Sequence, residues 1–208
     1  MKASVILLLL ILSMNARGND NPRMRNYISY SVSNDSWISL SGTTNINTFE
    51  CFSDAGINGG TVLTDPAPEE NRVTFSGAGL VKEIRSFDCQ NPLINRDMYR
   101  SFGKGDDAGI DIKLVDAGIA EGDLISESGN FIANTYVTIN GQTRRVEIGI
   151  DWQSNGGMEY FFGGTAELAM SDFGIKPPSP MMGLIKVDDT ITVRFNLIVQ
   201  PDAISRLE

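Results

Sequence analysis

The chain has 208 residues, of which 41% are hydrophobic and 21% charged, and this is ordinary for a globular protein with one sizeable core. It contains no histidine, which excludes a Ser-His-Asp triad, a Cys-His nucleophile and histidine-containing zinc sites. Its formal net charge of −9 makes the chain as a whole a poor partner for nucleic acid or for anionic lipid headgroups.

The first eighteen residues have the features of a targeting segment. Lys2 supplies a positive charge, residues 5–12 form an unbroken apolar run, and Ala16 and Gly18 form a small-x-small cleavage pattern. The apolar run is too short for a transmembrane anchor. We therefore expect residues 1–18 to be a secretory signal peptide and residues 19–208 to be a periplasmic or secreted domain.

The chain has two cysteines, Cys51 and Cys89. In an oxidising compartment two cysteines in a small domain usually pair, and no histidine is present to activate a thiol. We expect a disulfide whose Cα atoms lie within about 7 Å of each other. In the chain-entropy model, closing a loop of 38 residues stabilises a fold by about 4 kcal/mol.

A polar stretch with two prolines at residues 65–70 predicts a loop, and one helix is expected after it. Asn91 is a suitable N-cap, Pro92 fits the first helical position, and Gly103 can end the helix. The apolar residues then fall on one face at a spacing of four: Ile94, Met98 and Phe102. Such a helix could cover an opening or an edge of a sheet.

Most of the remaining chain alternates with period two, as at residues 110–114 and 190–199, which indicates half-buried antiparallel strands. Asn140-Gly141 between two alternating runs predicts a hairpin with a two-residue type I′ turn. This turn places apolar residues on one face and polar residues on the other. The expected pairs are Thr135 with Val146, Ala133 with Ile148 and Phe131 with Ile150 on the apolar face, and Tyr136 with Arg145 and Asn134 with Glu147 on the polar face.

A second hairpin is expected at residues 153–157, and Gly163-Gly164 after it predicts a bulge or sharp bend of the kind that curls a sheet. A five-residue loop there lets large apolar residues meet: Trp152 with Met158, Ile150 with Tyr160 and Ile148 with Phe162. The elements together predict an all-β fold, an antiparallel β-barrel of about eight strands with one short helix.

Carboxylate chemistry does not require histidine, and three acidic doublets are candidates for it: Glu69-Glu70, Asp106-Asp107 and Asp188-Asp189. Adjacent acids on a strand point to opposite faces, and acids in loops are usually solvated, so we interpret all three as turn charges. We predict no catalytic residues, no metal site and no cofactor. The chain is therefore not expected to be an enzyme.

Four stretches between Trp37 and Val199 carry motifs of a known family. They are residues 41–49 (SGTTNINTF), residues 84–102 with NRDMY, residues 137–144 (VTINGQTR), and FGGTA to DFGI at residues 162–175 followed by VDDTITV at residues 187–193. In combination and order they resemble the YceI-like family of exported, lipocalin-like barrels, which are described as binding polyisoprenoid lipids. This chain lacks the His-Ser pair that many members carry in an early strand.

The resemblance implies that residues 19–208 form a lipid-binding barrel whose partner is a long apolar lipid of the polyisoprenoid type. Two alternatives stay open. A barrel with a filled core could act as a periplasmic interaction or stress-response protein, and it would have no continuous internal cavity. An integral outer-membrane barrel would show an outward apolar band with aromatic girdles.

A bound lipid would be expected along the inward faces of the central hairpins and of the final strand. The register argument puts six large side chains on one surface, and strand alternation adds two. A ligand pocket is mostly apolar with a few polar groups, which a tyrosine and a tryptophan could supply. The candidates are Phe131, Ile148, Ile150, Trp152, Tyr160, Phe162, Phe195 and Leu197.

Overall fold

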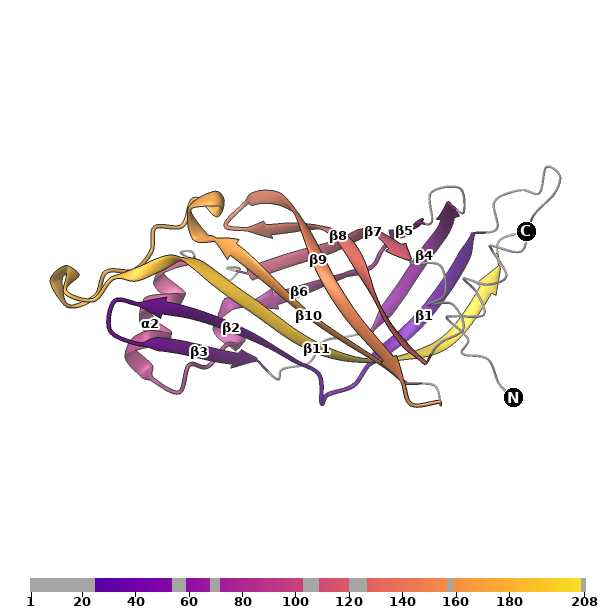
Figure 1. Ribbon diagram of the computed structural model, residues 1–208, viewed down its shortest axis with the longest axis horizontal. Helices are drawn as coiled ribbons and strands as arrows, with labels where there is room; N and C mark the ends of the chain where they lie inside the picture. The colour runs from indigo at the N-terminus through magenta and orange to yellow at the C-terminus, as the bar shows by residue number, and fades with distance from the viewer. Residues whose placement is uncertain are drawn as a thin grey trace.

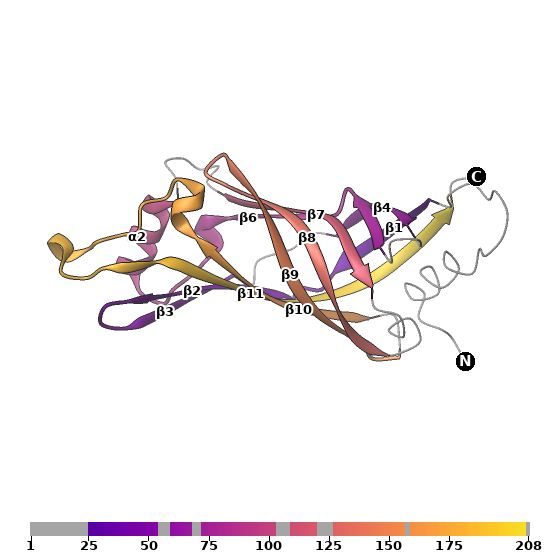
Figure 2. The same cartoon turned by 45° about the horizontal axis from the view of Figure 1, so that its top comes forward.

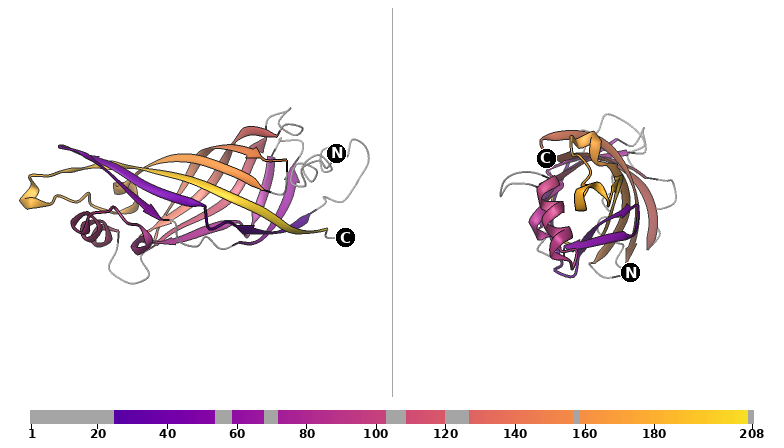
Figure 3. Two further views of the ribbon diagram at one scale, coloured as in Figure 1. Left: turned by 90° about the horizontal axis from the view of Figure 1, so that it is seen from below. Right: turned by 90° about the vertical axis from the view of Figure 1, so that its left-hand side faces the viewer.

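The computed structural model describes residues 25–53, 59–67, 72–102, 109–119, 127–156 and 159–206, and the expected signal peptide lies outside them. In the described chain, antiparallel strands form one continuous sheet. Eight of them close into a ring, because β1 pairs with β4 on one side and with β11 on the other. Figure 3 shows this barrel from one end, and the ring confirms the predicted fold.

The elements have the following bounds. The ring strands are β1 (Asn26–Val32), β4 (Gly60–Ala67), β5 (Arg72–Ser76), β7 (Gly109–Ile119), β8 (Ser128–Ile139), β9 (Gln142–Ser154), β10 (Tyr160–Ala169) and β11 (Val187–Arg206). The strands outside the ring are β2 (Trp37–Thr44), β3 (Thr48–Ser53) and β6 (Gly79–Glu83). The helices are α2 (Pro92–Ser101) and the short 3₁₀ helices η2 (Ile84–Ser86), η4 (Met170–Phe173) and η5 (Met181–Gly183).

The barrel is elongated, and its two ends are built differently (Figures 1 and 2). At one end, which we call the ring end, β1, β4 and β5 complete the circle of hydrogen-bonded strands. At the other, the helix end, the 20-residue strand β11 pairs with β2 instead of β1. The strands β3 and β6 and the helix α2 lie at this helix end.

At the helix end, a disulfide and hydrogen bonds join β3 to the segment that follows η2. Cys51 and Cys89 form the predicted disulfide, with Cα atoms 3.8 Å apart. Beside it, Phe52 and Asp88 exchange main-chain hydrogen bonds of 2.9 and 2.8 Å. The Tyr99 hydroxyl of α2 donates to the carbonyl oxygen of Phe87 at 2.7 Å. Covalent and hydrogen bonds together therefore hold α2 against the sheet.

The helix begins as predicted. Asn91 is its N-cap and accepts hydrogen bonds from the main-chain N–H groups of Leu93 and Ile94, and Pro92 is its first residue. Met98 and Phe102 are buried in the core below, and Ile94 packs against it. The helix therefore packs on the core through this face, whereas its expected end, Gly103, lies outside the described residues.

The hairpin at Asn140-Gly141 has every predicted cross-strand pair, from Ile139 opposite Gln142 to Phe131 opposite Ile150. Both turn residues have the positive φ that a type I′ turn requires, 51° and 72°. Ala133 is buried, as expected, and Glu147 is exposed on the other face. The register followed from turn chemistry and is confirmed at each position.

The second hairpin was predicted with the correct loop length but in the wrong place. Strand β9 continues to Ser154, which pairs with Tyr160, so the loop covers residues 155–159. Trp152 therefore faces Phe162, and Ile150 faces Gly164. The large apolar side chains still share one face, because each partner moves by an even number of residues.

Two further local predictions are wrong in part. The Gly163-Gly164 bulge is absent, since β10 pairs with β11 from residue 160 to residue 169 without a register shift, and the sharp bend stays a prediction. A bulge lies instead in β7, between Leu114 and Asp116. The loop predicted at residues 65–70 is wrong for its first three residues, because β4 continues to Ala67 and Pro66 pairs with Val73, and residues 68–70 lie outside the described residues. A proline can occupy a strand position that does not need its N–H.

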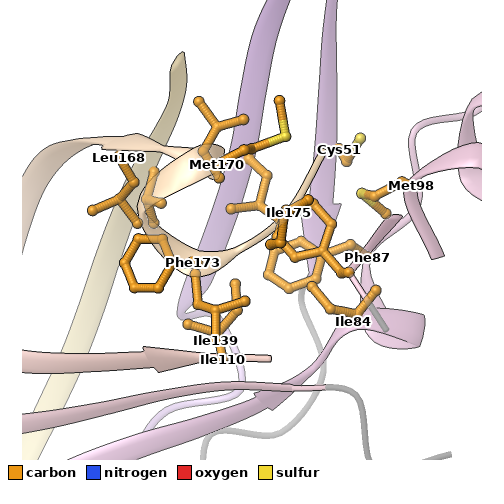
Figure 4. Close-up of a cluster of buried hydrophobic side chains, with 14 of the residues drawn as sticks. Cys51, Ile84, Phe87, Met98, Ile110, Ile139, Leu168, Met170, Phe173 and Ile175 are labelled. Atoms are coloured by element: carbon orange, nitrogen blue, oxygen red, sulfur yellow. The ribbon is translucent and has the colours of Figure 1, made fainter. Parts of the chain in front are cut away.

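The main hydrophobic core fills the helix end (Figure 4). Side chains from β2, β3, η2, α2, β7, β8 and η4 converge there, and Phe87 and Phe173 are each 1% exposed. Gly174 ends η4 with a φ of 68°, a left-handed conformation that suits glycine, and Ile175 then turns back into the core. Stability is therefore concentrated at the end that the disulfide closes.

Candidate functional site

The inner face of the ring end has large apolar side chains that are not fully buried. Phe131, Trp152 and Phe162 point inward by register, yet each keeps part of its surface accessible to solvent. At the helix end, the inward aromatic side chains of Phe87 and Phe173 are 1% exposed. The interior of the ring end is therefore less completely filled than the interior of the helix end.

The structure brings all eight predicted lining residues onto one face of four neighbouring strands. Phe162 of β10 lies between Trp152 of β9 and Leu197 of β11, and Phe131 of β8 lies opposite Ile150 of β9. Ile148, Tyr160 and Phe195 complete the set at alternate positions of the same strands. The grouping is observed, and the binding role of these residues stays a prediction.

Part of this set already packs on itself. Ile148 and Ile150 are buried in a second, smaller core cluster with Ala133 and Ala166. Phe131, Phe162 and Phe195 of the predicted set pack against that cluster. Trp152, Tyr160 and Leu197 lie outside it, toward the ring end. The cluster thus forms a layer of packed side chains between the filled helix end and the ring end.

Aromatic rings pack on this layer of side chains. Phe162 makes an edge contact with Phe131 at 6.5 Å between centroids and stacks on Tyr160 at 6.4 Å. Gly164 provides the space that Phe195 occupies, because a Cβ atom there would lie 2.4 Å from the Phe195 ring and 3.0 Å from Ile150. This close approach, and not a bulge, explains a glycine at that position.

The strands that close the ring contribute lining residues that were not predicted from the sequence. β1, β4 and β5 add inward residues opposite the predicted set, and Val73 of β5 lies opposite Ala117 of β7. Period-two alternation along each strand was the available signal for them. These additional lining residues are Asn26, Ile28, Tyr30, Val32, Val62, Thr64, Val73 and Phe75.

The inner face carries several uncharged polar groups. Thr64 donates to the carbonyl oxygen of Asn26 at 3.4 Å, and Thr135 donates to that of Val146 at 2.9 Å. Burial raises the pKa of Tyr30 above its usual value, so its hydroxyl is neutral at physiological pH. Lys82 stands on the inner face at the helix end, opposite Ile110, and is 5% exposed. The lining of the ring end suits an apolar ligand with few polar atoms.

The acidic doublet that lies within the described residues has a structural explanation. Asp188 and Asp189 belong to β11 and not to a turn, which corrects our interpretation. Asp188 accepts a hydrogen bond from Thr43, and Asp189 accepts from the main-chain N–H of Ser171 at 2.9 Å. The other two doublets lie outside the described residues.

Among the described residues, no group of three or more His, Cys, Asp and Glu side chains is placed to hold a metal ion. Within the same part of the chain, none of the helices has the length and apolar character needed to cross a membrane.

No protein-family model matches the chain, and neither does any curated protein sequence. Among solved structures it is similar to a polyisoprenoid binding domain from Saccharophagus degradans implicated in plant cell wall breakdown, with a TM-score of 0.58, 9% identity, and coverage of 84% of this chain and 99% of that one. It is also similar to Burkholderia cenocepacia BcnA, with a TM-score of 0.56, 16% identity, and coverage of 81% and 99%. The chain therefore has the lipocalin-like barrel fold of YceI-like proteins.

Proposed function

We propose that this YceI-like barrel is an exported binding protein that holds one long apolar lipid, of the polyisoprenoid type, at its ring end. The observation that carries the proposal is the inner face itself. There, Phe131, Trp152, Phe162 and Leu197 keep accessible surface inside a closed ring of strands. Apolar surface left accessible in a concave site is the usual feature of a pocket for an apolar ligand.

The comparisons support the class of ligand. One similar structure is named for polyisoprenoid binding, and the sequence motifs resemble the same family. The chemistry of the lining agrees, since its polar groups are hydroxyls and amides of residues such as Tyr30, Thr64 and Asn26. A lipid carrier needs no reacting groups, so we propose binding and not catalysis. Export rests on the pattern at residues 1–18.

The alternative is a barrel whose interior is filled and that has no ligand. The second core cluster favours it, because Phe131, Phe162 and Phe195 already pack against buried Ile148 and Ile150. If these contacts continue through the ring end, the protein would act through its surface, as an interaction or stress-response protein. The two functions differ in one measurable property, which is whether a lipid occupies the barrel.

Native mass spectrometry of the exported protein, before and after incubation with a long-chain polyprenol, tests the proposal. The wild type should carry one lipid per chain, identified after extraction. Val199→Trp should lose it, because Val199 lies opposite Tyr160 and Val32 on the inner face and the indole would take the lipid's place. Glu167→Trp adds the same bulk at an exposed position of β10 and should keep the lipid.

The filled-core alternative predicts a different result. The wild type would then carry no lipid from the cell and would acquire none from an excess of polyprenol. Equal lipid occupancy in Val199→Trp and the wild type would show that the lipid binds elsewhere on the protein.

A further inference from the structure

The outermost point of the helix end is an apolar tip made of two neighbouring loops. We define the tip as residues 176–186, which include η5, together with residues 45–47 of the β2–β3 turn. In Figures 1, 2 and 3 this part of the chain extends farthest from the barrel along its long axis. Its apolar side chains face solvent: Ile46 is 65% exposed, Met181 66%, Met182 106% and Leu184 72%.

Hydrogen bonds hold the two loops of the tip in a defined conformation. Asn45 joins the two loops, because its side-chain amide donates to the carbonyl oxygen of Leu184 at 3.0 Å and its side-chain oxygen accepts from the N–H of Lys186 at 2.8 Å. The Asn45 N–H also donates to the carbonyl oxygen of Lys186 at 3.1 Å. Within the longer loop, the N–H of Val187 donates to the carbonyl oxygen of Pro178 at 3.2 Å. These bonds hold the exposed side chains in place.

The main chain at the tip is in an uncommon conformation. Met181, Met182 and Gly183 are successive left-handed residues, with φ values of 53°, 56° and 86°. Side chains other than glycine rarely adopt this conformation, and where they do, a function is a reasonable hypothesis. The turn fixes two adjacent methionines outward, where each side chain is more than half exposed. An isolated protein gains nothing from such exposure.

The charge of the tip differs from that of the rest of the chain. The chain has a net charge of −9, whereas residues 176–186 contain Lys176 and Lys186 and no carboxylate. The acids nearest to it along the chain, Asp172, Asp188 and Asp189, lie outside these residues. The tip therefore presents apolar side chains flanked by cations.

We propose that this tip docks on a phospholipid bilayer, with Met181, Met182, Leu184 and Ile46 entering the interfacial region and the two lysines lying among the lipid phosphates. Apolar side chains flanked by lysines are the composition that partitions into membrane interfaces. Lysine stems can extend along the apolar layer while the ammonium group stays with the headgroups. The inference does not depend on what the ring end binds, and it would bring a lipid-binding barrel to the surface where lipids reside.

Vesicle flotation with the full exported chain tests the docking. The wild type should float with vesicles of phosphatidylethanolamine and phosphatidylglycerol. Met181→Ser with Met182→Ser should weaken binding more than tenfold, since two apolar side chains no longer enter the interface. Lys186→Gln should weaken it about fivefold, the usual contribution of one lysine at an anionic surface. Val81→Ser, which removes an apolar side chain that is 70% exposed on β6, is the matched control and should bind as the wild type does.

Tryptophan fluorescence measures how deeply the tip enters the bilayer. Met182→Trp should show a blue-shifted emission with these vesicles and quenching by brominated acyl chains, after subtraction of the wild-type signal from Trp37 and Trp152. Val81→Trp should show neither change. The serine variant should keep its polyprenol adduct in native mass spectrometry, which separates a failure of docking from a failure of lipid binding.

Three results would overturn the proposal. The wild type could fail to float with the vesicles, or the double serine variant could float as well as the wild type. Sedimentation equilibrium could also show a dimer of the wild type that the serine variant cannot form, in which case a second copy of the chain covers the tip.

Discussion

The helix end and the ring end of the barrel are closed by different means. At the helix end, the Cys51–Cys89 disulfide, the Phe52–Asp88 bridge and α2 close the structure over the main core. At the ring end, β1 pairs with β4 and β11, and hydrogen bonds between strands complete the circle. One end is filled and covalently fastened, whereas the other keeps large apolar side chains partly accessible.

If the ring end binds the proposed lipid, this difference separates stability from binding within one sheet. A filled core resists substitution because its side chains have no space to move into, whereas a partly filled one tolerates added bulk. Strands β7 to β11 pass through both ends, so the filled end can hold the inner face of the other end in shape. A ligand could then enter and leave without unfolding the domain. Four predictions follow from the comparison, in order of decreasing effect.

Removing the disulfide should have the largest effect and should act on one end. Cys51→Ala with Cys89→Ala should lower the free energy of unfolding by about 4 kcal/mol, the chain-entropy value for a 38-residue loop. Urea denaturation measures the loss. Hydrogen exchange should quicken in β3 and α2 and stay near the wild-type rate in β1 and β4. Equal acceleration at both ends would show that they unfold as one unit.

Adding bulk should distinguish the two ends on a single strand. Val193 and Val199 lie on the same face of β11, the first at 5% exposure in the main core and the second opposite Tyr160 at the ring end. Val193→Trp should cost roughly 1–3 kcal/mol through overpacking. Val199→Trp should leave the unfolding midpoint of the lipid-free protein close to that of the wild type. If both variants lost the same stability, the ring end would be as filled as the helix end.

The same comparison explains how far the sequence could predict the structure. Where chemistry is local, prediction succeeded: Asn140-Gly141 requires positive φ at both residues, and this set the register of β8 and β9. The loop at residues 155–159 has no such unique requirement, so its length was predicted but its position was two residues early. The lining residues kept their common face because side chains alternate along a strand.

The barrel was predicted, but which strands close its ring was not, because this depends on contacts between distant parts of the chain. No local pattern shows that β11 pairs with β2 over its first part and with β1 over its last part. Nor does one show that Ile28 of β1 lies opposite Val62 of β4. For the same reason half of the candidate site was missed. Alternation in residues 26–32 was visible in the sequence, but nothing indicated that this strand completes the inner face.

Weakening α2 should have a moderate effect and should leave the ring end unchanged. Asn91→Ala removes the acceptor of the Leu93 and Ile94 N–H groups, and losing such a cap costs about 1 kcal/mol. Asn91→Asp keeps a carboxyl acceptor and should restore most of the lost stability. Polyprenol occupancy should be the same in both variants. A loss of lipid in Asn91→Ala alone would show that α2 is part of the binding site.

The smallest effect should come from Tyr30, and it should depend on pH. Burial disfavours the charged phenolate, so the pKa of Tyr30 is raised in the folded protein. A raised pKa means that the unfolded chain releases the proton first. The contribution of Tyr30 to stability is therefore complete below its pKa in the unfolded chain, about 10, and it is lost as pH rises through its pKa in the folded protein.

Tyr30→Phe cannot ionise, so its urea midpoint should fall less than that of the wild type between pH 9 and 11, a range that spans the unfolded-state pKa of about 10. Because Tyr30 faces the ring interior, a bound polyprenol would bury it further and should widen this difference. If the two proteins lost stability in parallel, with and without polyprenol, then Tyr30 would face water, and the ring end would not be the apolar interior that the comparison requires.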